Sequence, residues 1–283
     1  MRPITDPKLV KMIEDHRNMK YTVQHWLERN LQKVEITDVP DGVLFDLAAD
    51  GDDPQARYCT YREQVELVHD KSWVFVVDEF ARRIHTNLTA LKRELRACLR
   101  VAGRPLVQID IKNSQPLFIG LAARKAGVED RRYLDLCQQD LYQHLAHLGG
   151  LSRQEVKEQL TQKALFAGNR SPHQRLPVKR LFDREFPQMA RFIRETKDVR
   201  RAADNPRPHN KLAKLAQKTE ANFLIYGGVC ERIRREEPGC WISTIHDSVL
   251  VQPEWAEYVG GVMLEEFGKL GVQPRLEVEP CDR

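Results

Sequence analysis

The chain has 283 residues, enough for one large domain or two ordinary ones, and its 41% hydrophobic and 30% charged residues allow a core beneath a heavily charged surface. No apolar run approaches the ~20 residues of a membrane-spanning helix, the first residues form no apolar signal region, and none of the six cysteines is spaced as C-x-x-C. We therefore expect a cytoplasmic protein with no membrane partner, and neither a zinc knuckle nor a thioredoxin-like site.

Positive charge is concentrated in one part of the chain. Residues 153–218 contain 17 Lys and Arg against 7 Asp and Glu, a local excess of +10, whereas the whole chain carries +4 and the remainder therefore −6. A concentrated basic block favours a polyanionic partner, and nucleic acid is the first candidate. The alternative is a solvated helical surface without a ligand.

Hydrophobic periodicity and turn residues predict the elements of the N-terminal part. Helices are expected over 7–35 and 87–99, and a strand over 73–77. The second helix would place four leucines on one face: Leu88, Leu91, Leu95 and Leu99. Residues 36–56 contain two groups of turn residues and indicate a mobile acidic connection.

The remainder is predicted to be mostly helical. A capping box begins one helix at Ser152, because Glu155 follows three residues later. The Gly227-Gly228 pair predicts a close approach by other backbone. Further helices are expected over 116–126, 131–148, 175–202 with a break near Pro187, 211–235 and 254–270, and a β-hairpin turns near His246-Asp247-Ser248 before a last edge strand. The predicted fold class is α+β, a small antiparallel sheet with a helical insertion and a helical N-terminal region.

Two apolar segments are each followed by an aspartate at the start of a polar turn. Asp110 follows Leu106-Val-Gln-Ile, and Asp247 follows Trp241-Ile-Ser-Thr-Ile-His, 137 positions later. Either aspartate alone is more typical of an Asx-turn than of catalysis. Together, held rigidly at the edge of a sheet, they could bind two Mg²⁺ ions and support nucleotidyl transfer.

A basic helix and a polar cluster accompany the aspartates. Arg153 and Lys157 are four residues apart, so they lie on one helical face, with Lys163 and Phe166 further along. Cations on one face can receive a triphosphate, and an aromatic ring can stack on a base. The alternative is an exposed basic face. Lys112, Asn113 and Gln115 follow Asp110 either as ordinary loop or at the place where sugar and phosphate atoms arrive.

In this order, the segments resemble the DNA polymerase I family (family A) and its relatives, the single-subunit phage-type RNA polymerases, over about residues 78–255. The similarity is carried by five motifs: Ala81-Arg-Arg-Ile-His-Thr86, Asp110-Ile-Lys-Asn-Ser-Gln115, Arg153-x-x-x-Lys157, Gln217-Lys-Thr-Glu-Ala-Asn222 and Ile245-His-Asp-Ser248. The resemblance implies a polymerase palm in two parts, 78–130 and 211–283, a fingers insertion over 131–210, and a reduced thumb within 1–77. It also implies an intracellular enzyme of bacterial or phage-like type.

The resemblance assigns a role to each candidate residue. Asp110 and Asp247 would be catalytic and would hold two Mg²⁺ ions, for which Mn²⁺ can substitute. The residues expected to bind the nucleotide are Arg153, Lys157, Lys163, Phe166, Arg170 and Gln115; those expected to meet the primer and template are Arg83, Gln217, His246, Arg200 and Arg201. The implied partners are a DNA or RNA primer-template, nucleoside triphosphates, and proteins that supply thumb or processivity functions.

Three departures from the family pattern bear on the sugar of the nucleotide. The DNA enzymes usually have glutamate five residues after the first aspartate, where this chain has Gln115. The last motif reads His-Asp-Ser, as in the phage-type RNA polymerases, and Phe166 fits neither family's spacing. We expect a minimal DNA polymerase. The alternatives are an RNA polymerase or primase-like enzyme, and an inactive polymerase-like protein that binds nucleic acid.

If the basic block contacts phosphates, changing Arg200 and Arg201 to glutamate should weaken binding to all nucleic-acid sequences alike. Binding of the unchanged protein should fall steeply between ~50 and ~200 mM salt, because phosphate contacts release counterions. Fluorescence anisotropy with labelled oligonucleotides measures both effects. A flat salt dependence would exclude a phosphate-contact surface.

Overall fold

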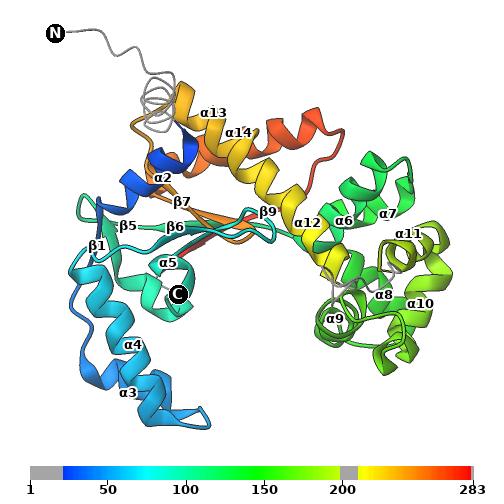
Figure 1. Cartoon of the computed structure of the whole chain (residues 1–283), viewed down its shortest axis with the longest axis horizontal. Helices are drawn as coiled ribbons and strands as arrows, with labels where there is room; N and C mark the ends of the chain where they lie inside the picture. The colour runs from blue at the N-terminus through cyan, green and yellow to red at the C-terminus, as the bar shows by residue number, and fades with distance from the viewer. Residues whose placement is uncertain (1–21, 198–209, 282–283) are drawn as a thin grey trace, which may run out of the picture.

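The computed structural model describes residues 22–197 and 210–281. Its centre is an antiparallel sheet of four strands in the order β7-β8-β6-β9, with β6 (Val107–Ile111), β7 (Ile242–Ile245), β8 (Ser248–Val251) and β9 (Leu276–Pro280). Helices surround this sheet and two smaller antiparallel sheets (Figure 1). The α+β fold class is therefore confirmed. Within the described ranges, no helix combines the length and the apolar character needed to span a bilayer.

The central sheet lies between two hydrophobic cores. Successive residues of β6 point to opposite faces, so Ile109 and Ile111 are buried in the larger core with Val249 and Val251 of β8. Leu250 points the other way, into the smaller core. Asp110 shares the face of Leu250, because it alternates with Ile109 and Ile111. Asp110 therefore lies on the face of the sheet that carries the smaller core.

The larger core is covered by helices on one face of the sheet. They are α2 (Val23–Leu31), α6 (Ser114–Lys125), α12 (Asn210–Ala221), α13 (Val229–Glu236) and α14 (Ala256–Lys269). A separate group of helices, which we call the helical lobe, comprises α7 (Arg131–Gln138), α8 (Leu141–Gly149), α9 (Arg153–Lys157), a π-helix (Glu158–Leu165), a 3₁₀ turn (Pro172–Arg175), α10 (Pro177–Glu185) and α11 (Pro187–Lys197). Helix α12 runs from the sheet to this lobe (Figure 1).

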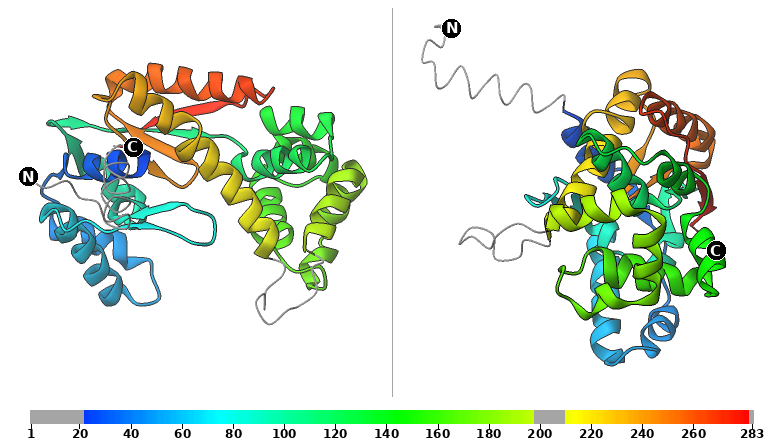
Figure 2. Two further views of the ribbon diagram at one scale, coloured as in Figure 1. Left: turned by 45° about the horizontal axis from the view of Figure 1, so that its top comes forward. Right: turned by 90° about the vertical axis from the view of Figure 1, so that its right-hand side faces the viewer.

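The N-terminal elements form the other side of the molecule. Strand β1 (Val34–Ile36) pairs with β4 (Leu99–Val101), which pairs with β5 (Arg104–Pro105), and β2 (Phe75–Val77) pairs with β3 (Ile84–Thr86). Helices α3 (Asp41–Ala49) and α4 (Pro54–His69) extend from the sheet on the side opposite the helical lobe, as both Figure 1 and the left view of Figure 2 show.

One sequence prediction in this region is partly confirmed and two are wrong. The helix predicted over 7–35 is present as α2, although Val34–Ile36 forms strand β1, and its part up to residue 21 lies outside the described residues. Residues 36–56 contain helix α3 instead of a continuous loop: Pro40 precedes its start, and Asp53 accepts a hydrogen bond from Ala56 to cap α4. Helix 87–99 is replaced by α5 (Asn87–Ala90) and a 3₁₀ helix (Arg93–Cys98), because Leu91 and Lys92 have non-helical backbone angles, and Leu99 begins strand β4, which pairs with β1.

Most other predictions are confirmed. Helix α6, the capping box of Ser152 and Glu155, the break at Pro187, the hairpin at His246 and Asp247, helix α14 and the edge strand β9 are all present. The helix predicted over 131–148 is divided, because Asp140 caps α8 by accepting a hydrogen bond from Gln143. The helix predicted over 211–235 contains a π-helix (Asn222–Tyr226) and a break at the two glycines.

Gly228 permits the close packing that ends this π-helix. A Cβ atom at Gly228 would lie 2.0 Å from the carbonyl oxygen of Phe223, whereas one at Gly227 would have only an ordinary contact, 3.8 Å from the carbonyl oxygen of Asn222. The π-helix positions Tyr226, whose hydroxyl donates to the carbonyl of Arg82 at 2.8 Å. Gly228 thereby supports the β2–β3 hairpin from a distance.

Gly228→Ala should destabilise the protein by about 2–3 kcal/mol, because the clash is with backbone and cannot be relieved by a rotamer change. Gly227→Ala is the matched control and should change the free energy of unfolding by less than about 1 kcal/mol. Urea denaturation measures both. Equal effects of the two substitutions would show that close packing at Gly228 is not needed.

Candidate active site

Asp110 and Asp247 come together at one end of the central sheet. Asp110 pairs with Ser248 across β6 and β8, and Asp247 is the preceding residue, in the two-residue turn that joins β7 to β8. Its neighbour His246 adopts a left-handed conformation with φ of 53°. Burial and the negative charge of Asp247 raise the pKa of Asp110 to about 6. The two carboxylates are therefore close enough to repel each other.

The start of helix α6 holds Asp247 in place. The Ser114 hydroxyl donates a hydrogen bond to the Asp247 carboxylate. The preceding residue, Asn113, has φ of 53°, and its amide donates to the carbonyls of Cys137 and Gln139 at 3.2 and 3.3 Å. This buried asparagine fixes the turn from β6 into α6, so Ser114 can bind Asp247.

A buried glutamate connects three segments beside the aspartates. Glu220 on α12 is fully buried and accepts two hydrogen bonds from the Arg83 guanidinium, at 2.9 and 2.8 Å. Its carboxylate also accepts from the Gln115 amide nitrogen at 3.3 Å. Burial raises the pKa of Glu220 to about 7, the Arg83 charge opposes this effect, and the Asp247 charge adds to it.

Two histidines flank the site on its other side. The rings of His85 and His246 are 6.2 Å apart, and His85 lies 3.2 Å from the carboxylate of Asp78. Burial and the charge of Arg83 lower the pKa of His246, which favours its neutral form. Asp78 also accepts hydrogen bonds from the backbone of Ala81 and Arg83, at 2.5 and 2.9 Å, and so shapes the hairpin that carries Arg83.

A lysine of the helical lobe acts electrostatically on Asp110. The positive charge of Lys157 lowers the pKa of Asp110, against the larger effects that raise it, so Lys157 is within electrostatic range. Arg153 instead forms an ion pair with Asp140 at 2.7 Å. Lys163 and Arg170 are exposed, and Phe166 is partly buried against the larger core.

The structure thus brings together Asp110, Asp247, Gln115, Arg83 and His246. Lys157 is exposed on α9, and its charge lowers the pKa of Asp110. Gln217 is half-buried on α12, one turn before Glu220. Arg153 donates a hydrogen bond to Asp140 through its Nε atom. Arg200 and Arg201 lie outside the described residues.

Sequence reasoning missed Glu220, Ser114, His85 and Asp78. A signal for Glu220 was present, because it continues the buried stripe of α12 formed by Leu212 and Ala216 at four-residue spacing. A charged residue at a core position of a helix is rarely buried without a partner. No local signal identified Ser114, because its partner lies 133 positions away.

The carboxylates of Asp110 and Asp247 are suitable ligands for Mg²⁺. This ion is commonly bound through one or two carboxylates, several waters and the phosphates of a substrate, rather than by a complete protein cage. Within 22–197 and 210–281, no group of three or more His, Cys, Asp or Glu side chains forms a cage. Lys112 is paired with Glu277 and Arg83 with Glu220. A divalent cation would relieve the repulsion between Asp110 and Asp247.

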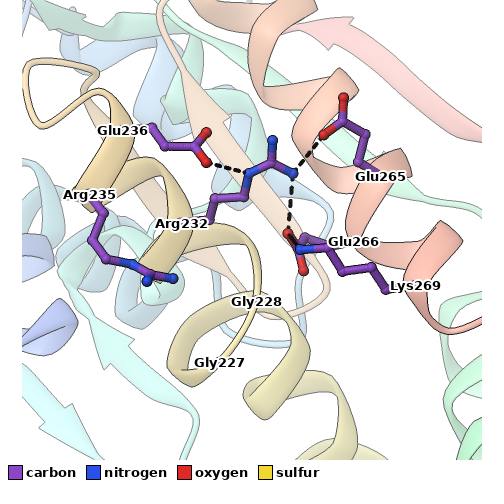
Figure 3. Close-up of a pocket in the computed structure, with 8 residues that line it drawn as sticks. All are labelled: Gly227, Gly228, Arg232, Arg235, Glu236, Glu265, Glu266 and Lys269. Carbon is purple, nitrogen blue, oxygen red and sulfur yellow. Dashed lines mark hydrogen bonds and ion pairs between the residues drawn. The ribbon is translucent and has the colours of Figure 1, made fainter.

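A second concave site has the wrong charge for this chemistry. A cavity of about 410 Å³ lies between α13 and α14, where Arg232 binds the carboxylates of Glu236, Glu265 and Glu266 at 2.7–3.2 Å (Figure 3). Arg235 and Lys269 complete a lining of three cations and three carboxylates. These charges balance, so the network joins the two helices and offers no excess charge to a phosphate.

Comparison with known proteins gives no assignment for this chain. No protein-family model matches it, and no curated protein matches it significantly.

Asp110→Asn should raise the thermal midpoint of the metal-free protein by about 2–4 °C at about pH 7.5, because it removes a buried like-charge repulsion. A folded-state pKa of about 6, above the ordinary 3.8, means that ionisation of Asp110 costs folding free energy as pH rises through this interval. The increase in thermal midpoint should therefore vanish below about pH 4, where the Asp110 carboxyl group is protonated in both the folded and the unfolded protein. Differential scanning calorimetry across this range provides the test; a destabilised Asp110→Asn protein at neutral pH would contradict it.

Proposed function

We propose that this protein is a template-dependent nucleotidyltransferase, a minimal family A-like DNA polymerase that extends a primer 3′-hydroxyl with nucleoside triphosphates. The observation that carries the proposal is the juxtaposition of Asp110 and Asp247 on neighbouring strands of a small antiparallel sheet. The sheet would be the polymerase palm, the helical lobe the fingers, and the N-terminal helices a reduced thumb. The proposed setting is cytoplasmic.

Asp110 and Asp247 would hold the two Mg²⁺ ions. Bound Mg²⁺ supplies charge neutralisation for the triphosphate and lowers the pKa of the attacking hydroxyl. Ser114 keeps the Asp247 carboxylate fixed, so little reorganisation is needed when the substrate arrives. Burial and the charge of Asp247 raise the pKa of Asp110, and a bound divalent cation would favour its ionised form.

Residues around the carboxylates would orient the substrates. Lys157 would contact the triphosphate, because its charge already reaches Asp110. Lys163 and Arg170, both exposed, would add positive charge on the same lobe, and Phe166 would meet the base. His246, whose lowered pKa favours the neutral ring, would approach the primer terminus together with Gln217. A cavity of about 410 Å³ beside it is lined by His85 and His246.

Two features weigh against a purely structural role for the aspartates. Placing two carboxylates together in a half-buried site destabilises the folded protein. Perturbed carboxylates of this kind concentrate at functional sites. A catalytically inactive relative that only binds nucleic acid would not be expected to retain them.

Primer extension tests the proposal directly. Asp110→Asn and Asp247→Asn should each reduce Mg²⁺-dependent incorporation by about 10³-fold or more, while binding to the primer-template stays nearly unchanged. Asp135→Asn, on the exposed surface of α7, is the matched control and should leave incorporation unchanged. DNA and RNA templates, each with dNTPs and rNTPs, cover the range of substrates.

The proposal would be overturned if the unchanged protein incorporates no nucleotide under any of these conditions, or if both aspartate variants remain active. Binding measured in parallel by fluorescence anisotropy separates a loss of chemistry from a loss of the complex.

A further inference from the structure

The helical lobe contains a small polar cavity that the proposed function does not use. Its volume is about 130 Å³, and it is lined by residues of α10, α11 and the segment that follows the π-helix. The polar side chains of the lining are those of Asn169, Gln174, Lys179, Asp183, Arg194 and Lys197. These residues belong neither to the aspartate site nor to the expected nucleotide contacts, so the cavity needs an explanation of its own.

The lining carries an excess of positive charge, part of which is buried. Lys179 is 5% exposed and Lys197 is 4% exposed, and Arg194 adds a third, exposed cation. Among the described residues Asp183 is the one carboxylate of the lining, so three cations against one anion leave a formal charge of +2. The cavity between α13 and α14 has, by contrast, as many carboxylates as cations. Buried charge without a partner opposes folding, so this lining favours an anion.

The two buried ammonium groups are held in place with hydrogen-bonding capacity left over. Lys197 Nζ donates to the carbonyls of Leu165 and Ala167, at 3.0 and 2.9 Å, which leaves one of its three protons. The Lys179 ammonium pairs with Asp183, one turn later on α10. Burial and the charge of Lys179 lower the pKa of Lys197 to about 8, and the Asp183 charge opposes them only in part. An anion in the cavity would accept the remaining proton and offset this charge.

The size of the cavity restricts what can enter it. A volume of about 130 Å³ is well below the ~300 Å³ at which pockets for ligands as large as a nucleotide begin. A phosphate within a nucleic-acid strand carries a sugar on each side, and lysines that are only 4–5% exposed leave little access for two sugars. A free tetrahedral oxyanion has no such substituents, and its oxygens accept charge-assisted hydrogen bonds from ammonium groups.

We infer that this cavity is a binding site for a free tetrahedral oxyanion, of which inorganic phosphate is the representative. Lys179 and Lys197 would donate to the anion from α10 and α11, and Arg194 would add positive charge at the exposed side. The bound anion would join these two helices to the end of the π-helix, because Lys197 already contacts the carbonyls of Leu165 and Ala167. The site holds whether or not the protein transfers nucleotides.

Phosphate binding is measured by isothermal titration calorimetry and by the thermal midpoint between 0 and ~20 mM phosphate, with NaCl keeping the ionic strength constant. An anion that binds the folded protein stabilises it by mass action, so the midpoint should rise and then level off as the site fills. Constant ionic strength holds charge screening fixed, and chloride at the same ionic strength should give no such rise.

Substitutions in the lining should act in opposite directions. Lys197→Met removes a buried cation and should raise the Kd for phosphate at least about tenfold. Asp183→Asn removes the lining carboxylate and should lower the Kd at least about threefold, because the anion no longer meets a like charge. Arg180→Ala, an exposed cation of α10 outside the lining, is the matched control and should leave the Kd unchanged.

If Lys197→Met does not fold, Arg194→Ala replaces it: this exposed residue can be changed without disturbing the core, and its loss should raise the Kd about threefold. A phosphate response equal to that of chloride, or one that these lining variants leave unchanged, would overturn the inference and leave the cavity to water. A short oligonucleotide added to the same titration should not alter the Kd for phosphate. Displacement of phosphate by the oligonucleotide would overturn the assignment to a free anion and show a contact for a nucleic-acid strand instead.

Discussion

The antiparallel register between β6 and β8 is the constraint on which the candidate site depends. Because Asp110 pairs with Ser248, the turn residue Asp247 must lie beside it, although the two aspartates are 137 positions apart. A slip of one residue would turn Asp110 into the larger core and Ile109 toward the site. The buried residues Ile109 and Val249 make that slip costly, so the same packing that stabilises the sheet also aligns the carboxylates.

Around this register, buried polar contacts join segments that are distant in sequence. Ser114 ties α6 to the β7–β8 turn, and Glu220 ties α12 to both α6 and the hairpin that carries Arg83. The first contact holds Asp247 itself, and the second joins Arg83 and Gln115 through one buried carboxylate. Polar networks of this kind are costly when incomplete, so their formation depends on the whole fold being in place. The site is therefore a property of the assembled sheet and helices, and no single segment could form it.

The sequence predicted those parts of the fold that local chemistry controls. Turn residues marked the His246-Asp247 hairpin, and the spacing of Ser152 and Glu155 marked a helix start, because both signals act within a few residues. The prediction of a helix up to residue 99 was wrong at its end because Leu99 pairs with Ile36 of β1, a tertiary contact that outweighs local helix propensity. For the site, the two aspartates could be anticipated, whereas the pairing of Arg83 with Glu220 could not, since it depends on how α12 packs against the β2–β3 hairpin.

A crystal structure with Mn²⁺, a primer-template and a non-hydrolysable nucleoside triphosphate would test the central claim most directly, because anomalous scattering locates the metal without assuming an activity. The account predicts two anomalous peaks, roughly 3.5–4 Å apart, with carboxylate oxygens of both Asp110 and Asp247 as ligands. Peaks at other positions, or none between these two aspartates when the nucleotide is bound, would contradict it.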